Sequence, residues 1–123
     1  MNDNGMDRAY SYYLAACTLL ECKNVSEALK LFQKSLMLDK HFKTLEKISL
    51  CYQKLGSINM ALKYIELAFD ANPRNNKTAY IFAEQLKRNG NTAKAKEVLQ
   101  FILKVNPSYK KAKMLLNEIE ILS

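Results

Sequence analysis

The sequence predicts an all-α chain built from helical hairpins. Apolar residues recur three, four and seven positions apart along most of its 123 residues, which is the period of one helix face. The alternation of a half-buried strand is confined to the short tail Glu118–Ile121, which fits the end of a helix better. Three landmarks recur 34 residues apart: Gly56 and Gly90, Ala61 and Ala95, and Pro73 and Pro107.

The central segment, residues 42–75, carries the repeated pattern most completely. Ser49 and Ala61 are small where two helices would cross, so the helix axes can approach closely. Gly56 follows the first helix at a position that often needs a left-handed backbone. Pro73 follows the second helix and cannot continue it. One helix–turn–helix unit therefore accounts for the segment.

This pattern resembles the tetratricopeptide repeat (TPR), a helix–turn–helix unit of 34 residues. Leu45 stands for the large residue of the family pattern, Ile48–Ser49 for its Leu-Gly pair, and Ile65 for its Phe. The remaining positions match the pattern: Tyr52, Gly56, Ala61, Ala68 and Pro73. The resemblance implies a right-handed TPR superhelix, or α-solenoid, of three repeats and a C-terminal capping helix.

The resemblance also sets the expected boundaries of seven helices in one domain, residues 1–123. The repeats are expected at about 9–41, 42–75 and 76–109, with the capping helix at about 108–122. The first repeat is one residue shorter, because Ala28 lies 33 residues before Ala61. In it, Tyr12 and Ala15–Ala16 hold the large and Leu-Gly positions, and Lys23 holds the position of the turn glycine.

Helix ends are predicted from polar residues that can cap the first backbone N–H groups of a helix. The expected N-caps are Asp7, Asn24 or Ser26, Ser57, Thr92 and Ser108. Inward-facing residues are expected at helical spacing, including Ala15 in the first helix and Ala112, Leu115, Leu116, Ile119 and Leu122 in the last. Met114 and Ile121 fall outside that last stripe and are either exposed apolar residues or a small contact surface.

The composition favours an intracellular, non-secreted protein with acidic partners. The net charge of +7 comes mostly from lysine, so the basic residues form either a surface for acidic partners or a solvated face. Cys17, Cys22 and Cys51 show neither a Cys-x-x-Cys pair nor zinc-site spacing, so we expect buried, reduced thiols and no metal. The polar N-terminus resembles no signal peptide, and no apolar run could cross a bilayer. We expect a cytoplasmic protein.

No arrangement of residues predicts catalysis. The single histidine, His41, falls in a connector and is expected to be a solvent-exposed loop residue. The three glycines are too far apart to cradle a phosphate. Glu84 and Lys87 are expected to form an exposed ion pair of little energetic value. We therefore expect no enzymatic activity, no cofactor and no small-molecule substrate.

The resemblance implies that the first helix of each repeat lines a concave groove. The residues it places there are Tyr10, Tyr13, Cys17, Lys43, Lys47, Leu50, Lys54, Lys77, Tyr80, Glu84 and Lys87. Tyrosine offers a rigid apolar face with a polar tip, and lysine can follow acidic groups loosely. This predicts binding of a peptide or helix with apolar and acidic residues, unless the tyrosines pack between repeats and the lysines only solubilise.

Three functional hypotheses follow. The first is a protein-interaction module, acting as an adaptor, scaffold or chaperone. The second is a self-assembling or complex-docking scaffold, a homo-oligomer being one form, that uses the terminal helices with Met6, Met114 and Ile121. The third, nucleic-acid binding through lysines, is the least favoured because arginine is scarce and no recognition motif is present.

One known binding mode of the family is not expected. Some TPR proteins bind the C-terminal carboxylate of heat-shock chaperones with a Lys-Asn-Asn-Lys-Arg clamp. The corresponding positions are Tyr13, Cys17, Lys47, Lys77 and Ile81, of which only Lys77 agrees in kind. We therefore expect this clamp to be absent.

Overall fold

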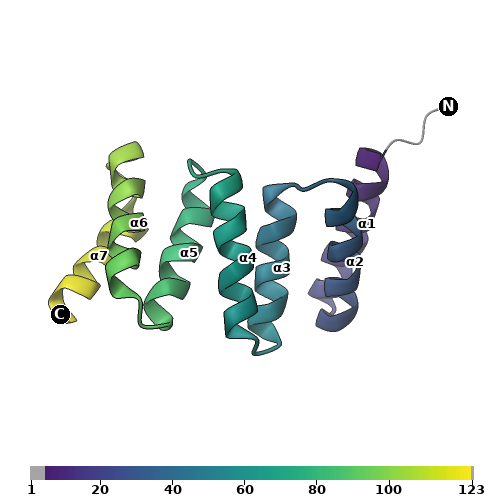
Figure 1. Cartoon of the computed structure of the whole chain (residues 1–123), viewed down its shortest axis with the longest axis horizontal. Coiled ribbons are helices and arrows are strands. Elements are labelled where there is room, and N and C mark those ends of the chain that lie inside the picture. Colours follow the sequence, from purple (N-terminus) through teal and green to yellow (C-terminus); the bar gives the residue numbers. More distant parts are fainter. Residues whose placement is uncertain (1–4, 123) are drawn as a thin grey trace. The chain divides into compact units, whose positions relative to one another are not determined.

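The computed structural model describes residues 5–122, with side chains described from residue 7 onward. This part of the chain contains seven helices and no strand (Figure 1), which confirms the all-α class. The helices are α1 (Gly5–Glu21), α2 (Val25–Leu38), α3 (Phe42–Lys54), α4 (Ile58–Ala71), α5 (Asn76–Arg88), α6 (Thr92–Val105) and α7 (Lys110–Leu122).

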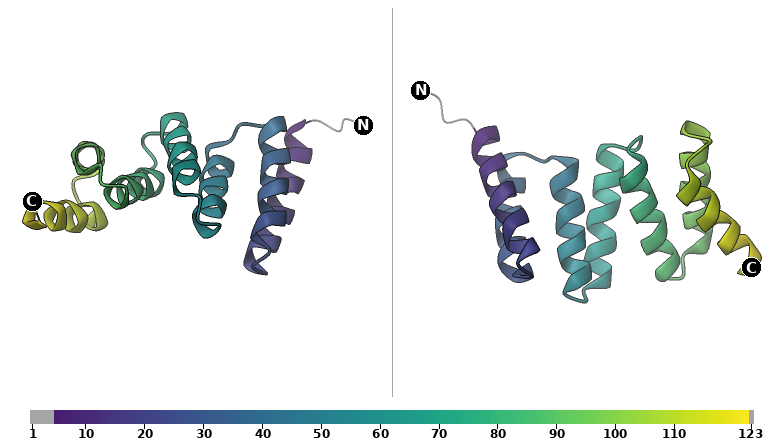
Figure 2. Two further views of the ribbon diagram at one scale, coloured as in Figure 1. Left: turned by 60° about the horizontal axis from the view of Figure 1, so that its bottom comes forward. Right: turned by 180° about the vertical axis from the view of Figure 1, so that it is seen from behind.

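The helices belong to two compact units, Met1–Ala71 (unit 1) and Asn72–Ser123 (unit 2). In unit 1, α1 packs against α2, α2 against α3, and α3 against α4. In unit 2, α5 packs against α6, and α7 contacts both of them. Seen from behind, α7 (yellow) lies across α6 (green) in Figure 2. The seventh helix thus covers an apolar face that the last hairpin would otherwise expose to water.

Small residues are buried at the helix crossing of each hairpin. The pairs are Ala16 and Ala28, Ser49 and Ala61, and Ala83 and Ala95, each at most 1% exposed. The Ser49 hydroxyl donates a hydrogen bond of 2.6 Å to the Ala61 carbonyl, which joins α3 to α4. In the same way the Ser35 hydroxyl donates to the Ala9 carbonyl at 2.7 Å, joining α2 to α1. Small side chains let these backbones approach, and the hydroxyls add hydrogen bonds across the contact.

All three intra-repeat turns use a residue in the left-handed backbone region. Gly56 and Gly90 have φ values of 83° and 82°, and Lys23 has φ 66°. After each of these residues, the next backbone N–H donates to the carbonyl five residues earlier: Asn24 to Leu19, Ser57 to Tyr52, and Asn91 to Leu86. This geometry is the Schellman motif, which satisfies carbonyls at a helix end. In the first repeat a lysine therefore adopts a conformation that disfavours a side chain.

Several predicted caps are wrong by one to three residues. Helix α1 begins at Gly5, so Asp7 lies in its first turn, where its charge still suits the helix dipole. Asn91, not Thr92, caps α6, with its side chain accepting from the Lys94 N–H at 3.2 Å. Helix α7 begins at Lys110, and Ser108 donates to the Asn106 side chain instead of capping it.

Two other helix starts differ in how they are capped. Asn24 occupies the N-cap of α2 but makes no side-chain cap hydrogen bond. Asn75 caps α5, because its side chain accepts from the Thr78 N–H at 3.0 Å. Ser26, two residues after Asn24, fits the capping pattern equally well, so the pattern alone does not decide between them.

The buried residues agree with the predicted helix faces except at three positions. Ala15 is exposed, because its neighbour Ala16 occupies the crossing with α2. Leu122 is 74% exposed, since α7 extends past the hairpin that it covers. Cys22 is exposed beyond the end of α1, whereas Cys51 is fully buried with Phe32 in the core of unit 1. The expectation of three buried thiols is therefore wrong for Cys22.

Candidate functional site

Two tyrosines stack along the surface of α1. The ring centroids of Tyr10 and Tyr13 lie 6.5 Å apart, with the rings only 11° from parallel. The Tyr13 ring also meets the core residue Phe32 edge-on at 5.6 Å. Tyr10 is 62% exposed, whereas Tyr13 is half-buried. Tyr13 is therefore fixed by the core, and Tyr10 extends that aromatic surface into solvent.

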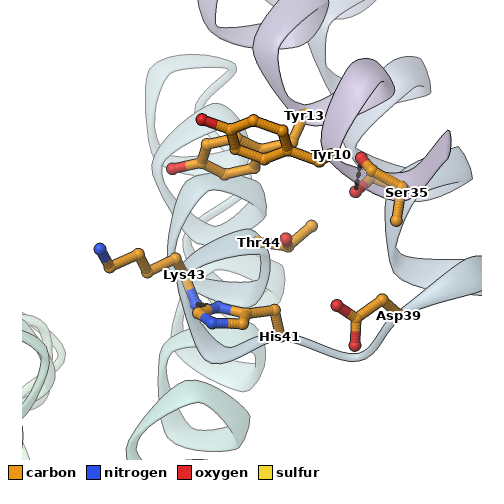
Figure 3. A pocket seen from close by; sticks show the side chains of 8 residues that line it. Tyr10, Tyr13, Ser35, Asp39, His41, Lys43 and Thr44 are labelled. Carbon is orange, nitrogen blue, oxygen red and sulfur yellow. Dashed lines mark hydrogen bonds between the residues drawn. The ribbon is translucent and has the colours of Figure 1, made fainter. Parts of the chain in front are cut away.

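A pocket of about 320 Å³ lies beside the tyrosine stack (Figure 3). Its lining comes from α1, the end of α2, the connector and the start of α3: Ala9, Tyr10, Tyr13, Ser35, Asp39, His41, Lys43 and Thr44. Figure 3 shows both tyrosine rings on one side of the pocket and His41 with Lys43 on the opposite side. The pocket therefore has an aromatic wall facing hydrogen-bond donors.

His41 has a structural position that the sequence did not reveal. It is the N-cap of α3, and its Nδ1 accepts a hydrogen bond of 3.1 Å from the Lys43 backbone N–H. Its ring stacks on Phe42, with centroids 5.0 Å apart. Because Nδ1 is the acceptor, the neutral ring carries its proton on Nε2, which is a donor. The residue is exposed, as expected of a connector histidine, but its ring is oriented by the helix that it caps.

Tyr13 and Cys17 both pack against the core cluster that contains Cys51. Tyr13 has a side-chain hydrogen bond with Cys17. Burial, and then the negative charges that Cys17 and Glu46 can carry, raises the pKa of Tyr13 to about 12, so its hydroxyl stays protonated at neutral pH. Burial raises the pKa of Cys51 to about 11, although the positive charge of Lys47 opposes that rise. A buried neutral thiol of this kind is a packing residue and not a nucleophile.

Unit 1 thus carries seven of the predicted groove residues on α1 and α3. We call them the unit-1 face: Tyr10, Tyr13, Cys17, Lys43, Lys47, Leu50 and Lys54. Each of them is half-buried or exposed, so none is covered by the core. Tyr10, Tyr13 and Lys43 meet at the pocket, while the lysines further along α3 lie outside its lining.

The repeat pattern missed the pocket residues outside the groove positions of α1 and α3. Ser35, Asp39 and His41 come from the end of α2 and from the connector. The repeat pattern takes groove residues only from the first helix of each repeat, so it does not include residues of α2 or of the connector. The one available signal was the polar segment Asp39–His41 directly before a predicted helix, which is a capping pattern.

In unit 2 the predicted groove residues contact the capping helix. Tyr80, Glu84 and Lys87 line a pocket of about 250 Å³ together with Arg88 of α5 and with Leu115 and Glu118 of α7. Lys87 Nζ lies 3.0 Å from Glu118 Oε2, so its carboxylate partner is on α7 and the expected pair with Glu84 is wrong. Lys77, further along α5, is exposed.

Tyr80 contacts Tyr109, which precedes α7, and Lys111 in the first turn of α7. Its ring centroid lies 6.4 Å from that of Tyr109, at an angle of 60°. Lys111 Nζ lies 5.8 Å above the Tyr80 ring. Burial, and then the negative charge of Glu84, raises the pKa of Tyr80. The tyrosine is therefore half-buried by its own unit.

Within residues 5–122, no helix is both long and apolar enough to span a lipid bilayer. In the same part of the chain, no group of three or more His, Cys, Asp or Glu residues is placed to hold a metal ion.

Comparison with protein families identifies the fold. The family model for the tetratricopeptide repeat matches residues 9–42 and 42–75, which is more than half of the chain. The chain belongs to the tetratricopeptide repeat family. TPR domains also appear among the similar solved structures, which agrees with an all-α TPR array. A search of curated protein sequences finds no match.

Three similar solved structures contain bound peptides. The first TPR of Spaghetti (RPAP3), bound to the HSP90 peptide SRMEEVD, has a TM-score of 0.84 at 16% identity, covering 95% of this chain and 94% of that one. The second TPR domain of human RPAP3, in complex with the HSP70 peptide SGPTIEEVD, has a TM-score of 0.83 at 16% identity, covering 95% and 98%. The Yersinia enterocolitica type III secretion chaperone SycD, in complex with a peptide of the translocator YopD, has a TM-score of 0.83 at 18% identity, covering 94% of each chain. At these identities the similarity shows the fold.

Proposed function

We propose that this TPR chain is a non-catalytic protein-interaction module that binds a peptide segment of a partner on the unit-1 face. The observation that carries the proposal is the stack of an exposed Tyr10 on a fixed Tyr13 beside a pocket that also holds Lys43. An aromatic side chain held on a core contact loses little conformational entropy when it binds, which favours a role as an anchor.

The chemistry of the pocket defines the ligand class. An apolar or aromatic side chain of the peptide would lie against the tyrosine rings. A carboxylate next to it would meet Lys43 Nζ and the Nε2–H of His41, which lie across the pocket from the rings. Asp39 belongs to the same lining and disfavours peptides with several acidic groups at this point.

Further acidic residues of the peptide would lie along α3. Lys47 and Lys54 are one and three turns beyond Lys43, so they form a basic row on the same helix. Leu50 lies between them and is half-buried, which offers an apolar contact in that row. We therefore propose an extended or helical segment that combines apolar and acidic residues.

The bound peptides of similar TPR structures support peptide binding as the general mode but not the same ligand. HSP90 and HSP70 peptides end in Glu-Glu-Val-Asp in those structures. In this chain the positions of the family clamp hold residues such as Tyr13 and Cys17, which cannot replace lysine and asparagine there. We expect no saturable binding of the peptide SRMEEVD in a fluorescence anisotropy titration, and tight binding would show that the clamp is replaced by other groups.

We further propose that the chain acts in the cytoplasm as an adaptor, scaffold or chaperone. The three cysteines are free thiols, which suits a reducing compartment. The residues Lys77, Tyr80, Glu84 and Lys87 of unit 2 are proposed to contribute less, since α7 contacts the pocket that three of them line.

The test is selection of a peptide library on the immobilised full chain. Wild-type protein is expected to enrich peptides with an aromatic or aliphatic residue next to Asp or Glu. The double variant Tyr13→Ala with Lys47→Glu should lose that enrichment while its circular dichroism spectrum stays helical. Tyr64→Ala is the control for loss of a tyrosine, since its ring stacks on Tyr52 and does not line the pocket. Equal enrichment on wild type and double variant would exclude the unit-1 face as the site.

A further inference from the structure

The outer side of α7 exposes apolar residues that the fold of unit 2 does not use. Met114 and Ile121 are 66% and 72% exposed, whereas Ala112, Leu115 and Ile119 of the same helix are buried. Met114 and Ile121 are seven residues apart, so they lie on one stripe of the helix, together with Lys110 and Asn117. This stripe lies opposite the buried side chains of α7, and Met114, Asn117 and Ile121 line a pocket of about 550 Å³ to which Tyr80 of α5 also contributes.

The charges on α7 change sign along the helix. Lys110, Lys111 and Lys113 are in its first turn, while Glu118 and Glu120 are near its C-terminal end. Helical geometry places Lys113 and Glu120, seven residues apart, on one flank of the stripe. The same spacing places Lys111 and Glu118 on the other flank. Each flank therefore carries one basic and one acidic group.

We infer that α7 is a contact surface for a second copy of this chain, with the two α7 helices antiparallel about a two-fold axis. In that orientation Lys113 faces Glu120 of the second copy, and Lys111 faces Glu118 of the second copy. The symmetry repeats each pair, so four opposite-charge contacts flank the stripe. Met114 then packs beside Asn117, and Ile121 beside the aliphatic stem of Lys110.

Charge complementarity selects this occupant over others. An acidic peptide would be repelled by Glu118 and Glu120, and a basic one by the three lysines. A parallel pair of α7 helices would bring the basic ends together and the acidic ends together. Among these occupants, an antiparallel copy of the same helix matches both ends at once, which gives the self-complementarity of an isologous contact.

Contacts within unit 2 modify the two flanks differently. Glu118 is already bonded to Lys87, and Lys111 lies over the Tyr80 ring. Lys113 and Glu120 are both exposed, so their flank is expected to contribute more to the contact. One 13-residue helix buries a small area, which places the dimer among weak, concentration-dependent associations. The inference does not depend on peptide binding by the unit-1 face.

The test is sedimentation of the full chain over a hundredfold range of concentration, up to several hundred micromolar. Wild type is expected to pass from monomer to dimer, and added salt should weaken the dimer. Lys113→Glu alone and Glu120→Lys alone should each weaken self-association at least tenfold. The double variant Lys113→Glu with Glu120→Lys should restore it, since the reversed pair still attracts. A monomer at all concentrations, or a double variant no better than the singles, would overturn the inference.

A second measurement fixes the orientation. In a Cys22→Ser background, a mixture of Lys110→Cys and Ile121→Cys chains should form a disulfide between the two variants under mild oxidation. Either variant alone should remain mostly uncrosslinked, because antiparallel packing places identical positions about 16 Å apart along the helix axis at 1.5 Å per residue. Efficient crosslinking of one variant with itself would indicate a parallel arrangement and overturn the proposal. A dimer that persists unchanged in Met114→Lys would place the contact elsewhere and also overturn it.

Discussion

The two units present the same repeat positions in different surroundings. In unit 1, Tyr10 and Tyr13 form an open stack beside a pocket, and Tyr10 is largely in solvent. In unit 2, Tyr80 is contacted by Tyr109 and Lys111, and Lys87 is bonded to Glu118. The residues that would meet a ligand in unit 1 therefore meet the protein's own last helix in unit 2.

This difference shows what a capping helix does besides covering apolar surface. Helix α7 also neutralises a lysine and packs beside a tyrosine that the repeat pattern assigns to binding. Side chains with an internal partner must lose it before they bind a ligand, which lowers their net contribution. We therefore expect binding energy to be concentrated in unit 1, and the following predictions test that expectation.

The largest effect is expected from removing the aromatic core of either unit. Phe32→Ala and Phe82→Ala should each lower the free energy of unfolding by about 3–5 kcal/mol, because both rings are at most 1% exposed. Only Phe32 supports Tyr13, so Phe32→Ala should also weaken peptide binding. Urea unfolding followed by circular dichroism measures the first effect, and anisotropy measures the second. The milder Phe32→Leu replaces the alanine variant if that variant does not fold. Equal losses of peptide binding in the Phe32 and Phe82 variants would contradict a difference between the two units.

A pH effect of on the order of 2 kcal/mol is expected from the buried thiol of unit 1. The pKa of Cys51 rises from 9.0 to about 11 on folding. The unfolded chain therefore loses this proton first, so the stabilisation is complete below pH 9 and is lost as the pH rises towards 11. Unfolding measured between pH 8 and 11 should show this decline in wild type and a shallower one in Cys51→Ala. Identical slopes would mean that folding does not raise the pKa of Cys51. Tyr13 lowers the stability further only above pH 10, because its pKa rises from 10.0 to about 12.

The matched tyrosine variants compare the two surfaces directly. Tyr10→Ala should weaken a selected peptide by about 2 kcal/mol, or roughly thirtyfold, as expected for an aromatic anchor. Its stability should change by less than about 0.5 kcal/mol, because the side chain is mostly exposed. Tyr80→Ala should change binding by less than about threefold. Calorimetric titration checks both values, and a larger loss at Tyr80 would reverse the assignment.

The smallest effects are expected at the left-handed turn residues. Lys23→Gly should stabilise the chain by about 1 kcal/mol, because glycine adopts the φ of 66° without strain. Gly56→Ala and Gly90→Ala should each destabilise it by about 1 kcal/mol. No atom lies within 4 Å of an added Cβ at either glycine, so the backbone alone accounts for the change. A thermal melt in which Lys23→Gly does not raise the melting temperature, or in which the two alanine variants do not lower it, would show that the turn backbone adjusts to the new residue.

Much of the fold could be predicted because helical spacing and turn residues act locally. Gly56 and Gly90 mark turns in which one residue has a left-handed backbone conformation, which glycine adopts readily. Ala61 and Ala95 mark close helix crossings. The caps at Asn91 and His41 could not be predicted, since several nearby polar residues fit each helix start equally well. Choice among them depends on how the preceding helix ends.

The candidate site was predictable only in part. The positions of Tyr10, Tyr13 and Lys43 follow from the repeat pattern, and the structure brings them to one pocket. The contributions of Ser35 and Asp39 depend on how α2 and the connector pack beside α1, which the repeat pattern does not encode. The bond between Lys87 and Glu118 joins residues 31 apart in sequence, so it follows from the packing of α7 and not from local spacing.

Amide chemical-shift mapping with a library-selected peptide tests the central claim most directly. Titration of the peptide into isotope-labelled protein should shift the signals of α1 and α3, with the largest changes at Tyr10, Tyr13, His41 and Lys43. Signals of α5 and α7 should move little. Shifts confined to α5 and α7, or to α2 and α4, would contradict a binding surface on α1 and α3.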